Sequence, residues 1–193
     1  MKRFTLVLAF FACAMMSVSH ARAAGEDAAR DYVVKVANEL LVVVNGGGAN
    51  TNEFRQLFRS HAAIKTMSDF CLGRYRKNMS QQQLGEYTAL VEDFIVSLFR
   101  KHADSFKGKA LSIYSVKART PSDVTVSARV HLNSGEITPI KFRVIKEGGT
   151  YKIHDINVAG IWLVVQMRNQ FVDIMQQSKG DGAALISYLK TNS

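Results

Sequence analysis

The side chains most often used in catalysis are scattered along this 193-residue chain rather than grouped. Beyond residue 23 the histidines stand far apart, at His61, His102, His131 and His154. His154 and Asp155 are adjacent, but neighbouring strand residues point to opposite faces unless a bulge intervenes. Cys71 lies between two apolar residues and has no neighbouring base, which indicates a buried, unreactive thiol.

Motifs that mark enzymes and metal sites are also missing from the sequence. The chain contains no G-x-S-x-G, H-E-x-x-H or C-x-x-C pattern. Gly46-Gly47-Gly48 is not followed by Lys-Ser/Thr and comes after a predicted helix, so it does not fit a phosphate-binding loop. We therefore expect no catalytic residues, no metal site and no cofactor, and predict that the protein is not an enzyme.

The first half of the chain has the apolar spacing of helices. Apolar residues three and four apart predict a helix over 26–44, a second helix capped by Asn50, and a third that closes at Gly73. Ser80-Gln81-Gln82-Gln83 is a capping-box pattern, and it opens the longest predicted helix, over about 81–104.

Beyond residue 110 the apolar period changes to two, which predicts strands. We expect four of them, over about 111–116, 124–132, 140–144 and 151–158. Turns are expected at Asn133-Ser134-Gly135 and Gly148-Gly149, and a bulge near His154-Asp155, where the apolar phase shifts. Two helices follow, the first ending near Lys179-Gly180.

This order of elements predicts an α+β fold, in which helices pack on the apolar face of a four-stranded antiparallel meander. Large apolar side chains are in surplus on the faces expected to point inward. They either pack as ordinary core or line a cavity for flexible acyl chains, to which thioethers can adapt. We expect a strand face and helix faces to enclose this space, formed by Val126, Ala128, Val130, Ile140, Phe142 and Val144 on the strands, and by Phe94, Leu98, Leu163, Met167, Phe171 and Met175 on the helices.

The N-terminus reads as a secretory signal peptide over residues 1–23. Lys2 and Arg3 precede an uncharged apolar run of 15 residues, and Ala21-Arg22-Ala23 predicts cleavage before Ala24. The run is shorter than the roughly 20 residues that a membrane-spanning helix needs. An uncleaved anchor, or a lipoprotein through Cys13, is the less favoured alternative. The remaining 24–193 suit a single domain.

The chain is basic, with a formal net charge of +9. Removal of Lys2, Arg3 and Arg22 with the signal peptide would leave +6. No run of five or more like charges exists, so nucleic acid is not indicated as a partner. A moderately basic surface fits contact with anionic lipid headgroups or acidic proteins, or serves only to keep the protein dissolved.

A motif near the C-terminus resembles the signature of the MlaC family, also called toluene-tolerance or phospholipid-binding periplasmic proteins. The strand Tyr151-Lys152-Ile153-His154-Asp155 leads through Gly160 into a helix that carries Arg168 and Phe171. Leu72-Gly73-Arg74-Tyr75, before the Ser80-capped helix, is similar as well. The resemblance extends over nearly all of the chain after residue 23.

This resemblance implies a periplasmic phospholipid carrier that works with an outer-membrane lipoprotein and an inner-membrane ABC transporter complex, and so maintains outer-membrane lipid asymmetry. The transporter complex would include a membrane-anchored substrate-binding subunit. The acyl chains would lie inside the protein and the headgroup would face water. Asp155 and Arg168 belong to the motif, and two roles stay open for them: bracing the strand-to-helix turn, or, for Arg168, holding the headgroup phosphate.

Other functions are weighed against this one. A related carrier of a hopanoid, a quinone or another apolar ligand fits the same pattern. A lipid-modifying hydrolase is disfavoured, because no nucleophile and base are visible together. A two-lobed solute-binding protein is excluded by length, since 24–193 holds one meander and is too short for two α/β lobes.

Overall fold

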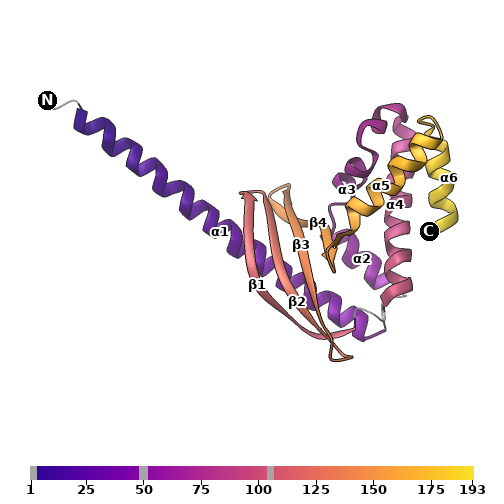
Figure 1. Ribbon diagram of the computed structural model, residues 1–193, viewed down its shortest axis with the longest axis horizontal. Coiled ribbons are helices and arrows are strands. Elements are labelled where there is room, and N and C mark those ends of the chain that lie inside the picture. Colours follow the sequence, from indigo (N-terminus) through magenta and orange to yellow (C-terminus); the bar gives the residue numbers. More distant parts are fainter. Residues whose placement is uncertain (1–3, 48–51, 104–106) are drawn as a thin grey trace.

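The computed structural model of the chain describes residues 4–47, 52–103 and 107–193, with side chains from residue 24 on. A long first helix crosses one face of a sheet, and the other helices gather beyond one edge of that sheet (Figure 1). The helices are α1 (Phe4–Asn45), α2 (Asn52–His61), α3 (Ile64–Leu72), the 3₁₀ helix η2 (Gly73–Asn78), α4 (Gln81–His102), α5 (Leu163–Gln177) and α6 (Gly182–Asn192). The strands are β1 (Gly108–Thr120), β2 (Asp123–Leu132), β3 (Ile137–Glu147), β4 (Thr150–Val158) and β5 (Ile161–Trp162).

The sheet is an antiparallel meander in the order β1-β2-β3-β4-β5. The predicted α+β class is confirmed, but the sheet has five strands rather than four. The fifth strand is two residues long, too short to show an alternating pattern in the sequence. Ala159 and Gly160 both take positive φ values, 51° and 92°, and this tight turn brings β5 back onto β4.

The predicted bulge in β4 is confirmed at His154. Arg143 of β3 pairs with Asp155, and the next residue of β3, Val144, pairs with Ile153, so His154 is the extra residue. A bulge breaks the strict alternation of strand side chains. His154 and Asp155 are consequently both buried, although they are adjacent.

Two local signals for helix ends are confirmed. The Ser80 hydroxyl accepts a hydrogen bond from the Gln83 amide at 3.2 Å, and the Gln83 side chain accepts one from the Ser80 amide at 2.9 Å, which is the capping box at the start of α4. Gly73, with φ of 52°, follows the last residue of α3. The predicted cap Asn50 lies outside the described residues.

Helix α1 is longer than the predicted 26–44. Its backbone runs without a break from Phe4 to Asn45. Its later part lies along the sheet, and its earlier part projects beyond it (Figure 1). The first described contacts come from Gly25, whose carbonyl accepts a hydrogen bond from the Tyr151 hydroxyl, and from Glu26, whose carboxylate accepts one from the Ala118 amide. Among the residues whose side chains are described, no helix is long and apolar enough to cross a membrane.

The buried apolar residues form two separate clusters. The sheet cluster joins the inner faces of β1 to β4 to Ala29, Val33 and Val36 of α1. The helix cluster joins α3, α4, α5 and α6 around Tyr87 and Phe171. The expectation that several helices share the apolar face of the sheet is therefore wrong for this arrangement: α1 occupies that face, while α3 and α5 reach the sheet at β4.

Candidate functional site

The strand residues expected to line a cavity do share one face of the sheet. All six belong to the sheet cluster or pack against it: Val126, Ala128, Val130, Ile140, Phe142 and Val144. The side chains of Val126, Ala128 and Val144 are fully buried. Their partners in this cluster include the small side chains Ala29 and Val33 of α1. Small side chains let the helix lie close to the pleated surface of the sheet. The apolar stripe of α1 was visible in the sequence, but its partner face was not.

The helix residues expected to complete the cavity lie elsewhere. Phe94, Met167, Phe171 and Met175 are buried in the helix cluster, where the Phe94 and Phe171 rings lie 5.9 Å apart. The predicted juxtaposition of the strand and helix sets is wrong, since the strand set and the four buried members of the helix set belong to different clusters. The described structure therefore does not show the cavity that the two sets were expected to enclose.

Two members of the helix set are also less buried than expected. Leu98 is 40% exposed at the end of α4, and Leu163 is 46% exposed as the first residue of α5. Leu98 follows the helical period of its stripe, but α6 ends before α4 does at this end (Figure 1). The apolar period identifies a face of a helix, and it does not show where along the helix the partner ends.

Asp155 holds the junction between the sheet and α5. Its carboxylate accepts hydrogen bonds from the amides of Val164, at 2.8 Å, and Ile156, at 2.7 Å. Burial raises the pKa of Asp155, and these backbone hydrogen bonds partly offset that effect. The bracing role expected for Asp155 is what the geometry shows, because the first turn of α5 has amides that lack helical partners.

Arg168 lies across the end of α3, one turn into α5. Its guanidinium donates to the backbone carbonyl of Phe70 and stacks 4.7 Å from the centre of the Phe70 ring. The Gly73 backbone leaves the space that this guanidinium fills, since a side chain at Gly73 would meet it at 2.8 Å. Of the two roles left open by the sequence, bracing the strand-to-helix turn or holding a headgroup phosphate, the structure shows neither directly, because the Arg168 guanidinium lies on a carbonyl of α3.

Between α1 and α2 the surface is hollowed into a groove of about 400 Å³. Its walls combine apolar and polar side chains: Glu39, Val42, Val43, Glu53, Gln56, Leu57, Ser60 and His61. His61 Nε2 donates to the Glu39 carboxylate at 2.8 Å, and the Tyr32 hydroxyl donates to the His61 carbonyl at 3.1 Å. Val42, 73% exposed, stands at the rim. This mixed groove was not anticipated, because α1 and α2 are brought together only by tertiary contacts.

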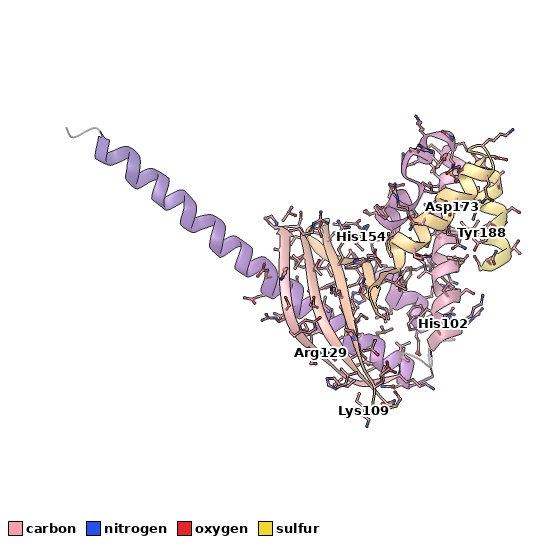
Figure 2. The ribbon with its side chains drawn as sticks, in the orientation of Figure 1. His102, Lys109, Arg129, His154, Asp173 and Tyr188 are labelled. Carbon is pink, nitrogen blue, oxygen red and sulfur yellow. The ribbon has the colours of Figure 1, made fainter. Side chains whose placement is uncertain are left out.

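Cys71 and His154 are not arranged to act as a nucleophile and base. Cys71 is fully buried in the helix cluster, and burial raises the pKa of its thiol to about 12. His154 is buried, and its Nδ1 has no hydrogen-bond partner among the described atoms. Its ring packs edge-to-face with the Phe70 ring, with the two ring centres 5.7 Å apart. Burial lowers the pKa of His154, so its imidazole is neutral at neutral pH. Figure 2 shows His154 where β4 approaches the helices, within the packed interior.

The known proteins that are similar to this chain include a curated relative and a solved structure. The toluene tolerance protein Ttg2D from Pseudomonas putida is 20% identical over 108 residues, which cover 56% of this chain. The chain spans about half the length of that curated relative, 50%. A solved structure of a phospholipid-binding protein from Ralstonia solanacearum, in complex with a phospholipid, superimposes with a TM-score of 0.74 at 22% identity. That match covers 84% of this chain and 94% of the other and shows that the fold is the same.

A family model provides the assignment. The model described as MlaC protein matches residues 35–191, which include α2 to α6, the whole sheet and the Asp155 junction. It also includes the motif from Tyr151 to Phe171 on which the resemblance was based. The match extends over most of the chain, and the protein therefore belongs to the MlaC family, as that motif predicts.

Proposed function

We propose that this protein is a periplasmic carrier of phospholipid, moving lipid between an outer-membrane lipoprotein complex and an inner-membrane ABC transporter complex. The observation that carries the proposal is the shared fold with a protein whose structure was solved with a phospholipid bound. Membership of the MlaC family supports the same function. The transporter, its membrane-anchored substrate-binding subunit and the lipoprotein are partners inferred from the family alone.

The physical need for such a carrier follows from the cost of exposing acyl chains to water. Each buried CH₂ group gains about 0.8 kcal/mol, so two chains of about 14 carbons gain roughly 22 kcal/mol by leaving water. A carrier must come close to this gain without greatly exceeding it, or release would fail. An apolar interior with few polar contacts satisfies this requirement, and the described interior has that character.

The acyl chains are proposed to lie against the strand face of the sheet cluster. That face is covered by α1 through small side chains, and Val130, Ile156 and Val158 at its margin are only partly buried. Displacement of α1 from the sheet would open an apolar surface without breaking the β ladder. Of the proposed lining residues, Ala128 has the smallest side chain and would leave the most room for a chain.

Export to the periplasm is proposed through the signal peptide over residues 1–23. Cleavage before Ala24 would preserve the contacts that Gly25 and Glu26 make with Tyr151 and Ala118. Intact-mass analysis of the periplasmic fraction should therefore find a chain that begins at Ala24. A full-length chain recovered from the membrane fraction would contradict both the cleavage and the location.

The cargo is identified by extracting the purified protein into organic solvent and recording mass spectra of the extract. The proposal predicts glycerophospholipid in near-stoichiometric amount. A hopanoid or quinone in its place would keep a carrier function and change the ligand class. An extract without lipid, from protein purified without detergent, would count against the carrier function itself.

A further inference from the structure

The outer face of the sheet carries a basic groove that the packing of the domain does not use. It lies on β1, β2 and β3, opposite the face covered by α1, and none of the described helices lies over it (Figure 1). The hollow measures about 410 Å³, and its walls are Tyr114, Ser115, Lys117, Arg119, Thr125, Ser127 and Lys141. The walls therefore provide three cations and four hydroxyl groups, and no acidic side chain.

An irregularity in β1 creates this lining. The register between β1 and β2 shifts between Ile113 and Ser115, so Tyr114 has no partner on β2. Tyr114 and Ser115 consequently both face the groove, although residues adjacent in a regular strand alternate between faces. The bulge thus places a 49%-exposed tyrosine ring beside the cationic side chains.

The positive charge of the groove is compensated only at Arg119, among the described residues. Asp123 pairs with Arg119 at 3.5 Å, but its carboxylate also accepts two hydrogen bonds from Arg143, at 3.1 and 2.9 Å. Lys117 and Lys141 have no carboxylate partner among the described residues. Arg129 adds charge beside the groove, with its guanidinium 4.6 Å from the centre of the Tyr114 ring, and Figure 2 shows Arg129 on the sheet.

We propose that this groove, Tyr114, Ser115, Lys117, Arg119, Thr125, Ser127 and Lys141, binds the phosphate headgroup of an anionic phospholipid in a bilayer surface, and so docks the protein on membranes. Ammonium, guanidinium and hydroxyl donors around one hollow suit the several oxygens of a phosphate. A tyrosine beside basic residues is the combination found at membrane interfaces. This combination favours a bilayer over an acidic protein. The inference does not depend on lipid cargo inside the protein.

The test is binding to vesicles by flotation, comparing phosphatidylcholine alone with a mixture containing phosphatidylglycerol. The wild-type chain from Ala24 should bind only the anionic vesicles and should dissociate as salt is raised. A lysine at a bilayer surface is worth about 1 kcal/mol, or about fivefold in affinity. The double variant Lys117→Gln/Lys141→Gln should therefore bind about 25-fold more weakly.

The matched control is Lys77→Gln/Lys101→Gln, which removes the same charge from exposed lysines on the helical side. It should lose much less affinity than the groove variant. Equal losses in the two doubles would show attraction by net charge alone and overturn the site. Stronger competition by polyglutamate than by inorganic phosphate at equal charge would overturn the bilayer assignment in favour of an acidic protein.

The lipid content of each variant separates this proposal from the carrier function. The groove variant should retain its extractable lipid, because the groove lies on the face opposite the sheet cluster. Wild-type protein that bound anionic vesicles but contained no lipid would sustain the docking groove while contradicting the carrier function. Wild-type protein that contained lipid but did not bind anionic vesicles would contradict the docking groove and leave the carrier function standing.

Discussion

The carboxylate of Asp155 accepts a hydrogen bond from the Val164 amide at 2.8 Å, so one buried side chain joins the end of β4 to the start of α5. This bond connects the two apolar clusters, because Val164 belongs to the helix cluster and β4 contributes to the sheet cluster. The second bond, from the Ile156 amide, fixes the same carboxylate on its own strand. The junction therefore sets how the helices are held against the edge of the sheet.

Replacement of Asp155 should destabilise the fold. Asp155→Ala leaves the amides of Val164 and Ile156 without their acceptor, and we expect a loss of about 2–3 kcal/mol in the free energy of unfolding. Urea denaturation measures it. Asp173→Ala, at an exposed position of the same helix α5 (Figure 2), is the control and should change stability by less than about 0.5 kcal/mol. Equal stability of the two variants would contradict the bracing role.

Replacement of Arg168 distinguishes its structural and headgroup roles. Arg168→Ala removes the hydrogen bond to the Phe70 carbonyl and the stacking on its ring, so the melting temperature should fall by about 3–8 °C. Arg74→Ala, at an exposed position, is the control and should leave it unchanged. If Arg168→Ala kept its melting temperature and lost extractable lipid, Arg168 would be a headgroup ligand instead.

Insertion of a large ring at Ala128 tests whether the strand face accepts acyl chains. We expect Ala128→Trp to stay folded and to purify with less lipid, because the ring would occupy the space of a chain. Ala118→Trp, also buried in the sheet cluster but close to the β1–β2 turn, should cost about 1–3 kcal/mol and keep its lipid. An Ala128→Trp protein that unfolds, or that retains all its lipid, would remove Ala128 from the proposed lining.

The pair of Asp123 and Arg143 should make stability depend on pH in the acidic range. Burial alone would raise the pKa of Asp123, but hydrogen bonds and charge from Arg143 outweigh it and lower the pKa. Its stabilising contribution is therefore present above the unfolded pKa of about 3.9 and is lost as pH falls through the lower folded pKa. We expect the difference in the free energy of unfolding between wild type and Asp123→Asn, measured by urea denaturation, to shrink as the pH falls from 6 to 3. The corresponding difference between wild type and Asp173→Asn, at an exposed position, should stay constant.

Cys71 should be unreactive in the folded protein. With its thiol pKa raised to about 12 by burial, Cys71 is almost wholly protonated at pH 8. Alkylation by iodoacetamide should be about a thousandfold slower than for an exposed thiol, and concentrated urea should restore the ordinary rate. Rapid labelling of folded protein, or phospholipid turnover that disappears in Cys71→Ala, would contradict the assignment of Cys71 as an inert core residue.

The sequence alone was sufficient to predict the α-helices, the four longer strands and several of their ends, but not η2 or β5. The capping box at Ser80, the glycine at position 73 and the phase shift at His154 are local signals, each readable from a few neighbouring residues, and the structure confirms all three. The motif from Tyr151 to Phe171 was also sufficient to indicate the MlaC family. These features depend on short-range backbone chemistry, which does not require knowledge of the tertiary fold.

Which apolar faces meet was decided only by the tertiary structure. The strand face around Ala128 and the helix face around Phe171 are equally apolar in sequence, yet one packs on α1 and the other among α3, α4 and α6. Apolar attraction has no direction, so a period reveals that a face is buried and does not name its partner. The partner of Arg168 and the groove on the outer face of the sheet likewise depend on contacts and register between segments distant in the chain, which the sequence alone does not encode in any local pattern.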